Sequence, residues 1–183
     1  MRGAGMEIGV VFAGFGGQGI LLAGKVLAQA AMERGFEVTW LPSYGPEMRG
    51  GTANCTVVIA DEPVGSPIVD RPQILVAMNG PSLERFGPRV APGGTIIFNA
   101  SLVSGPFARA DARLLPIPMN AIAQELGEVR AANMVALGAV VKVLGLFPLE
   151  AVAEALSKEL GARGRERLLE VNRQALLRGF SLA

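Results

Sequence analysis

Short apolar runs and amphipathic stretches alternate along the first two thirds of this chain. The runs at 7–13 and 73–78 are apolar almost throughout, which is typical of parallel strands buried on both faces of a sheet. Residues 18–34 instead carry apolar side chains at helical spacing, and Gly35 is placed to cap that helix. The predicted strands are 7–13, 37–41, 53–60, 73–78, 95–99 and 113–117. This alternation predicts an α/β fold with a mostly parallel sheet.

The segment from 37 to 60 departs from that alternation. Two strand-like stretches, 37–41 and 53–60, are separated by a loop and no helix. We therefore expect these two strands to form an antiparallel pair at an edge of the sheet. Residues 7–41 have the order and size of a βαβ unit.

The last third of the chain is predicted to be helical. Residues 133–145 are apolar nearly all round, so this helix should be buried. Pro148 suits the first turn of the following helix, and Gly161 ends it. The remaining predicted helices are 120–126 and 165–178, after a short helical turn at 82–86. We expect one Rossmann-like domain over 1–183, with helices on both faces of a sheet core (1–118) and a helical completion (119–183).

Composition narrows the classes of function. Half of the residues are hydrophobic, 18% are charged and the net charge is +1, so neither nucleic acid nor an acidic partner is indicated. The excess of apolar residues indicates a buried sheet and a surface that another subunit covers. No apolar run reaches the roughly 18 residues of a membrane span. The run at 8–13 leads into a strand rather than a cleavage site, so we expect a cytoplasmic protein without a signal peptide.

The chain has one cysteine, Cys55, and no histidine. These counts exclude an intrachain disulfide, a Cys-ligated iron–sulfur cluster, a Cys/His zinc site and a Ser-His-Asp triad. Because Cys55 lies within a strand pattern, we interpret it as a small core residue. Most self-contained catalytic machinery is thereby excluded.

A glycine cluster joins the first strand to the first helix, reading Gly14-Phe15-Gly16-Gly17-Gln18-Gly19. One interpretation is an anion site, in which backbone N–H groups and the helix dipole face a phosphate or carboxylate. The alternative is a tight turn that needs small residues only for packing. The spacing also matches the dinucleotide fingerprint G-x-G-x-x-G. That fingerprint requires an acid near the end of the second strand. This chain reads Trp40-Leu41-Pro42-Ser43 there and has no acid, which argues against a dinucleotide site.

A second candidate stretch follows the second strand. It reads Ser43-Tyr44-Gly45-Pro46-Glu47-Met48-Arg49-Gly50-Gly51. We expect it at the same end of the sheet as the glycine cluster, where open α/β sheets bind ligands. Glu47 and Arg49 are placed to contact a ligand, a partner subunit or each other in an ordered surface loop.

Two lesser candidates lie at Asn99-Ala100-Ser101 and at Asn133. Asn99 and Ser101 end a later strand at the same end of the sheet, where they are either polar groups of the site or ordinary turn residues. Asn133 opens the apolar helix, as a helix N-cap or as a contact of the site.

The stretches 14–19 and 43–51 together resemble the two signature stretches of the gamma subunit of 2-oxoacid:ferredoxin oxidoreductases. Asn133-Met134-Val135 also resembles this family, and the likeness covers roughly residues 6–145. Family members usually have Ala at the position of Met48. The resemblance implies a Rossmann-like module that packs against catalytic subunits. The residues that it marks as cofactor-binding or interface positions are Gly14, Gly16, Gly17, Gln18, Gly19, Ser43, Tyr44, Gly45, Glu47, Arg49, Gly50, Gly51 and Asn133.

The same resemblance implies a reaction. The family decarboxylates a 2-oxoacid oxidatively with coenzyme A as cosubstrate, forms an acyl-CoA and passes two electrons to ferredoxin. Thiamine diphosphate, magnesium and iron–sulfur clusters are implied in partner alpha and beta subunits, or in a ferredoxin-like delta subunit as well. This chain would hold no catalytic residue and no metal, and would be inactive alone. A free-standing gamma chain favours 2-oxoglutarate, followed by pyruvate, branched-chain acids or indolepyruvate.

Two other hypotheses stay open at this point. One is a stand-alone Rossmann protein that binds a nucleotide through the turn at Gly14. The other is a non-enzymatic scaffold whose crevice binds nothing.

Overall fold

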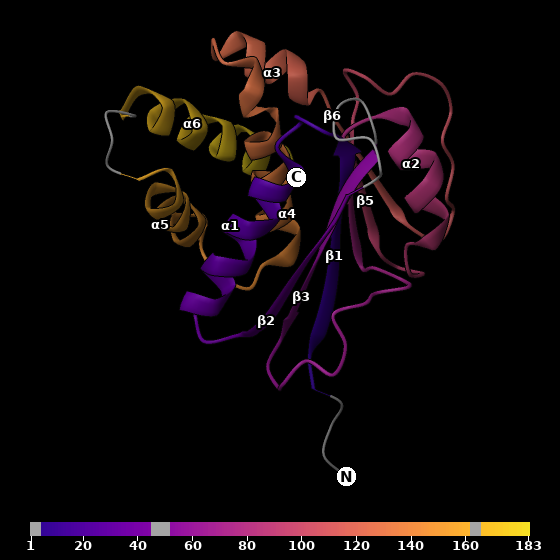
Figure 1. Ribbon diagram of the computed structural model, residues 1–183. Helices are drawn as coiled ribbons and strands as arrows, with labels where there is room; N and C mark the ends of the chain where they lie inside the picture. The colour runs from indigo at the N-terminus through magenta and orange to yellow at the C-terminus, as the bar shows by residue number, and fades with distance from the viewer. Residues whose placement is uncertain (1–4, 45–51, 162–165) are drawn as a thin grey trace.

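The computed structural model describes residues 5–44, 52–161 and 166–183, and its centre is a six-stranded sheet (Figure 1). The strand order is β2-β3-β1-β4-β5-β6, and β1, β4, β5 and β6 run parallel. The strands are β1 (Glu7–Phe15), β2 (Glu37–Tyr44), β3 (Thr52–Ala60), β4 (Ile74–Ala77), β5 (Thr95–Asn99) and β6 (Arg113–Ile117). The predicted α/β class is confirmed.

Helices cover both faces of the sheet, but unequally. The α-helices are α1 (Ile20–Glu33), α2 (Gly80–Phe86), α3 (Met119–Glu125), α4 (Ala132–Leu144), α5 (Leu149–Leu160) and α6 (Glu166–Leu182). Figure 1 shows α1, α4, α5 and α6 on one side of the sheet and α2 on the other. Two short 3-10 turns, η1 (Gly87–Arg89) and η2 (Val129–Ala131), precede β5 and α4. Within the described ranges, no helix is long and apolar enough to cross a membrane.

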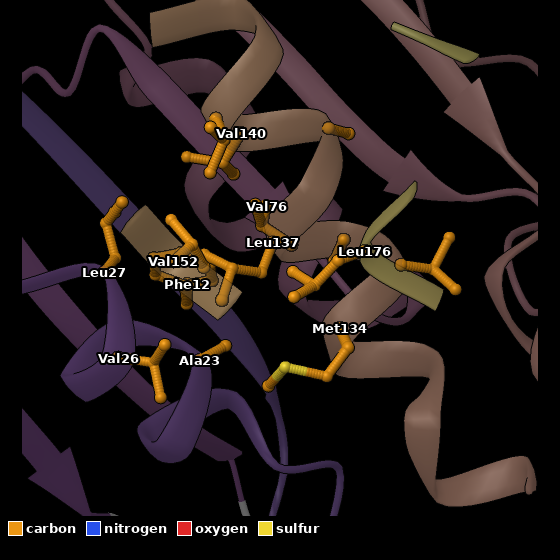
Figure 2. Packing of buried hydrophobic residues seen from close by; sticks show 14 of the residues in the cluster. Phe12, Ala23, Val26, Leu27, Val76, Met134, Leu137, Val140, Val152 and Leu176 are labelled. Atoms are coloured by element: carbon orange, nitrogen blue, oxygen red, sulfur yellow. The ribbon is translucent and has the colours of Figure 1, made fainter. Parts of the chain in front are cut away.

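The core follows the two-residue alternation of the strands. Val10 and Phe12 of β1 pack into the large cluster beneath α1 and α4, whereas Val11 and Ala13 pack into the smaller cluster beneath α2. Figure 2 shows Phe12 among apolar side chains of β4 and the helices. Because both faces are covered, the central strands read as continuous apolar runs in the sequence.

The end of α1 is built as predicted. Gly35 has φ 88°, its N–H donates to Met32 O at 3.0 Å, and Phe36 N–H donates to Ala31 O at 3.2 Å. This pair of bonds is a Schellman motif, which needs a residue in the left-handed region after the helix.

The strand order corrects the simple βαβ interpretation of residues 7–41. β3 lies between β1 and β2 and is antiparallel to both, so the two strands flanking α1 are not neighbours. The predicted antiparallel edge pair, β2 with β3, is confirmed. β2 also extends through Ser43 and Tyr44, which were predicted to lie in the loop. Pro42 is tolerated because β2 is an edge strand, where one N–H has no ladder partner to bind.

Two glycines set the distance between α4 and α6. A Cβ atom at Gly138 would overlap Leu176 O, and one at Gly179 would overlap Val135 O. The backbones of the two helices are therefore in direct contact, which no residue larger than glycine allows at these positions.

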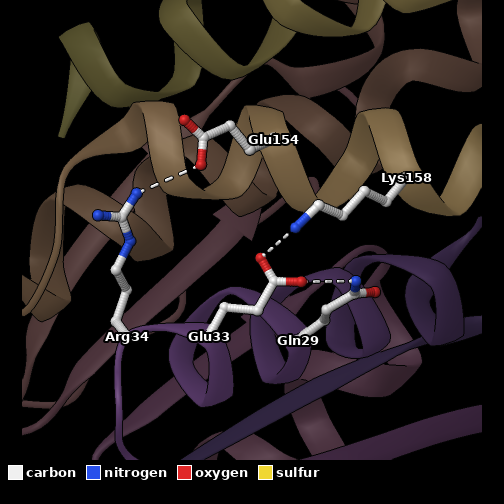
Figure 3. A network of polar contacts seen from close by, with 5 residues as sticks. All are labelled: Gln29, Glu33, Arg34, Glu154 and Lys158. Atoms are coloured by element: carbon white, nitrogen blue, oxygen red, sulfur yellow. Dashed lines mark hydrogen bonds and ion pairs between the residues drawn. The ribbon is translucent and has the colours of Figure 1, made fainter.

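Charged side chains tie α5 to the outer surface of α1 (Figure 3). Lys158 Nζ lies 2.9 Å from Glu33 Oε2, and Arg34 Nη2 lies 3.4 Å from Glu154 Oε2. The hydrogen bond from Lys158, followed by that from Gln29, lowers the pKa of the Glu33 carboxyl. These side chains are solvated, so they orient the helices more than they stabilise them.

Candidate functional site

The candidate residues gather at the carboxyl end of the sheet, the end where β1, β4, β5 and β6 finish. Phe15, the last residue of β1, pairs with Thr52, and Tyr44, the last of β2, pairs with Ala53. Tyr44 and Thr52, the described residues on either side of 45–51, therefore lie at the same end of the sheet as the turn at 14–19, as predicted. Ser43 is exposed on β2. Five of the predicted site residues lie outside the described residues: Gly45, Glu47, Arg49, Gly50 and Gly51.

The turn at residues 14–19, which we call the glycine turn, ends in the left-handed region. Gly17 has φ 93°, and Gly19, the N-cap of α1, has φ 72°. No side chain of the described residues caps the first turn of α1. Gly16 and Gly17 are exposed at the tip. The first-turn N–H groups of α1 therefore have no side-chain acceptor among the described residues.

Packing explains some of these glycines and not others. A Cβ atom at Gly14 would lie 2.7 Å from Gln18 Oε1 and 3.1 Å from Met78 Cβ. One at Gly19 would overlap the side-chain amide of Asn133. A Cβ atom at Gly17 would meet nothing within 4 Å. Gly14 and Gly19 thus serve close packing, whereas Gly17 serves only the backbone conformation of an exposed tip.

Gln18 links the glycine turn to the neighbouring strand. Its Oε1 accepts the N–H of Phe15 at 2.7 Å and the Nδ2 of Asn79 at 3.0 Å. Asn79 follows β4, is buried, and caps α2 by accepting the N–H of Ser82 at 2.9 Å. Sequence reasoning missed Asn79, although an Asn between an apolar strand and Gly-Pro has the pattern of a helix cap.

Asn133 holds the other side of the turn. It lies inside α4, whose N-cap is Ala131, so the N-cap interpretation of Asn133 is wrong. Its Nδ2 donates to Gly19 O at 3.0 Å, and the residue is buried. Asn133 therefore joins α4 to the start of α1.

Asn99 has all its hydrogen-bonding groups engaged. Its Nδ2 donates to Met78 O at 3.2 Å and to Asn120 Oδ1 at 2.7 Å. Its Oδ1 accepts the N–H groups of Ser101 and Met119 at 3.2 and 3.1 Å. Because each amide atom has two partners, Asn99 ties together the ends of three elements, which agrees with the turn-residue interpretation.

The geometry argues against a dinucleotide site. In that type of site an acid at the end of the second strand binds the ribose hydroxyls. Here β2 ends in Ser43 and Tyr44, and β3 separates it from β1. With strands about 4.8 Å apart, the end of β2 is about 10 Å from that of β1.

Cys55 is a core residue, as predicted. Its side chain is fully buried in β3, and its Sγ lies 3.4 Å from Ile20 O. Burial raises the pKa of the thiol to about 12, so Cys55 carries no thiolate at neutral pH.

Comparisons with known proteins extend over nearly the whole chain. The family model described as pyruvate ferredoxin/flavodoxin oxidoreductase matches residues 9–182. Ketoisovalerate oxidoreductase subunit VorA of Methanothermobacter thermautotrophicus is 44% identical over 97% of this chain and 36% of its own length. 2-Oxoglutarate synthase subunit KorC of Methanocaldococcus jannaschii is 35% identical over 93% of this chain and 90% of its own. This chain thus spans about a third of VorA but nearly all of KorC.

Solved structures agree with the sequence matches. The gamma subunit of a keto/oxoacid ferredoxin oxidoreductase from Geobacter sulfurreducens superposes with a TM-score of 0.83 at 29% identity, covering 97% of this chain and 96% of that one. A 2-oxoglutarate:ferredoxin oxidoreductase from Magnetococcus marinus gives 0.88 at 29% identity, covering 97% of this chain and 31% of that chain. The same fold therefore occurs both as a separate chain and as part of a longer one.

Proposed function

This chain belongs to the pyruvate ferredoxin/flavodoxin oxidoreductase family, and we propose that it serves as the gamma subunit of a 2-oxoacid:ferredoxin oxidoreductase. The observation that carries the proposal is the match over residues 9–182, together with full-length similarity to a chain that is itself a gamma subunit. The reaction would convert a 2-oxoacid and coenzyme A to an acyl-CoA and carbon dioxide, with two electrons passed to ferredoxin.

The chain's own contribution is structural rather than catalytic. One cysteine and no histidine cannot ligate an iron–sulfur cluster, so the clusters would be held by alpha and beta subunits or a ferredoxin-like subunit. We place thiamine diphosphate and magnesium in those partner subunits as well. We assign the glycine turn and the stretch at 43–51 to contact with those partners or with a cofactor that they hold. The uncapped first turn of α1 and the exposed Gly16 and Gly17 support this assignment.

The substrate proposed is a branched-chain 2-oxoacid such as ketoisovalerate. The sequence-based preference for 2-oxoglutarate is not confirmed, because VorA is 44% identical whereas the KorC subunit is 35% identical. Substrate choice would be made by the partner subunits that hold the reacting centre, so this proposal rests on relatedness alone.

Reconstitution tests the function. The chain would be purified alone and with the alpha and beta partners from its own source, and reduction of a viologen dye would be followed with a 2-oxoacid and coenzyme A. We expect no activity from the chain alone, activity from the complex, and the fastest turnover with ketoisovalerate. Full activity of the partners without this chain would contradict the proposal.

A further inference from the structure

The side-chain amide of Gln18 is held from two directions. Its Oε1 accepts the backbone N–H of Phe15 at 2.7 Å and the Nδ2 of Asn79 at 3.0 Å. Both bonds converge on the same oxygen, which lies toward the interior of the glycine turn. A side-chain amide carries its acceptor and its two donors on opposite branches, so the branch that remains is Nε2.

Asn79 decides which branch of Gln18 faces inward. The Oδ1 of Asn79 is occupied by the N–H of Ser82 at 2.9 Å, as the cap of α2, so its Nδ2 is the atom that faces Gln18. Asn79 is only 3% exposed, so water is not at hand to replace the bonds that its amide would lose by turning over. If Nε2 of Gln18 faced inward, this donor would meet two other donors, Asn79 Nδ2 and Phe15 N–H, and none of the three would have an acceptor. The hydrogen-bond network therefore has one self-consistent orientation.

We propose that Asn79 is a positioning residue, which orients Gln18 so that its Nε2 is presented as a hydrogen-bond donor at the carboxyl end of the sheet. Within the described residues, Gln18 Nε2 donates to no protein group. Its partner would be an acceptor oxygen, carried by a neighbouring subunit or by a cofactor of the complex. This inference rests on the proposed function, because the assembled enzyme supplies that oxygen.

The substitution Gln18→Glu tests the outward-facing Nε2 group of Gln18 separately from the inward-facing oxygen. A carboxylate keeps an oxygen for Phe15 N–H and for Asn79 Nδ2, and it changes only the outward NH₂ group to an oxygen. The nearby start of α1 favours negative charge, so the fold is expected to persist. Gln73→Glu is the matched control, because Gln73 Oε1 also accepts a β1 backbone N–H, that of Gly9, at 2.7 Å, but at the amino end of the sheet.

The substitution Asn79→Asp tests the positioning itself. The carboxylate still caps Ser82 N–H, but it offers Gln18 an acceptor instead of a donor. Gln18 is expected to turn over, donate Nε2 to the carboxylate and expose Oε1. This turnover gives up the bond from Phe15 N–H to Oε1, and we expect the stronger bond to a charged acceptor to outweigh that loss. Asn172→Asp is the control, because Asn172 is also buried and its side chain, among the described residues, bonds only Leu168 O of α6, at 2.8 Å.

The orientation is read directly by NMR on the full chain. We expect a coupling across the hydrogen bond between Phe15 N and Gln18 Cδ in the wild type, and its loss in Asn79→Asp. A wild-type chain without that coupling overturns the orientation whether or not the gamma-subunit function holds.

The consequence is read in the reconstituted complex. Gln18→Glu and Asn79→Asp are each expected to weaken one step about tenfold or more, since a donor to a charged or strong acceptor is worth that much. Weaker assembly assigns the acceptor to a partner subunit, and normal assembly with a raised KM for coenzyme A or thiamine diphosphate assigns it to a cofactor. Either result supports the proposal. Assembly and KM values equal to those of Gln73→Glu and Asn172→Asp would overturn it.

Discussion

At both ends of β1 a glutamine side chain accepts a strand N–H at 2.7 Å, Gln18 from Phe15 and Gln73 from Gly9. The surroundings of the two glutamines differ. Gln73 is exposed, and its own backbone closes the amino end of the sheet through ladder-like bonds to Gly9 and Thr95. Gln18 instead accepts a second hydrogen bond, from the buried side-chain amide of Asn79. The arrangement at Gln73 is therefore enough to bind the free N–H at the end of a strand, and the bond from Asn79 to Gln18 is an addition to it.

The contrast extends to the neighbouring strands. Buried asparagines lie at the carboxyl end, where Asn79, Asn99 and Asn133 fix the glycine turn and the strand ends around it. At the amino end the buried polar side chain is Thr95, which makes no side-chain hydrogen bond in the described part of the chain. Burying a side-chain amide is costly unless all its hydrogen bonds are made. The three satisfied asparagines therefore indicate that the carboxyl end of the sheet is held in one defined shape.

The largest effect is expected from Asn99→Ala. It leaves Met78 O, Asn120 Oδ1 and two N–H groups without their partner, and should lower the free energy of unfolding by about 3 kcal/mol. Thr95→Ala, at the other end of the same strand, should cost about 1 kcal/mol. Urea denaturation of both variants measures the difference. Equal losses would remove the contrast between the two ends.

A double-mutant cycle tests the contact between Gly19 and Asn133. Gly19→Ala should cost about 2–3 kcal/mol, from a left-handed φ and overlap with the Asn133 amide. In an Asn133→Ala background the overlap disappears, so the same change should cost about 1 kcal/mol less. If the two losses simply add, Asn133 does not confine the turn.

Gly17 and Gly93 form a matched pair across the sheet. Both have positive φ, 93° and 78°, and neither would bring a Cβ atom within 4 Å of a neighbour. Alanine should therefore lower the free energy of unfolding by about 1 kcal/mol at each position. Only Gly17→Ala is expected to weaken assembly with the partner subunits, measured by the binding affinity for them. A similar loss from Gly93→Ala would assign the interface elsewhere.

At neutral pH the smallest effect is expected from Cys55, a buried residue of β3. Its thiol has a pKa raised from 9.0 to about 12, so the native chain keeps this proton at pH values where the unfolded chain releases it. Stability should therefore be independent of this group below about pH 9 and fall as pH rises from 9 toward 12. Labelling with a thiol reagent at pH 8 should be slow in the native chain and in the Gly17 and Gly93 variants. Fast labelling of either variant would show that it disturbs the sheet and not only its end.

Local pattern was sufficient for most of the elements. The strands at 95–99 and 113–117 were predicted with their observed bounds, because apolar runs bounded by Gly and Pro leave little choice. The place of β3 between β1 and β2 was not predicted, because strand order depends on contacts between distant segments. The glycine turn could be located from the sequence because its glycines are consecutive in the chain, and its role as a site stays a prediction. Asn79 was missed because its importance comes from Gln18, 61 residues away.

Hydrogen exchange of the chain alone and in the reconstituted complex tests the central claim most directly, since it compares both ends of the sheet in one sample. We predict that assembly slows amide exchange at residues 15–22, the glycine turn and the start of α1, and leaves residues 93–95 at the amino end unchanged. Slowing confined to residues 93–95, or no change at 15–22 in a complex that turns over a 2-oxoacid, would contradict this prediction.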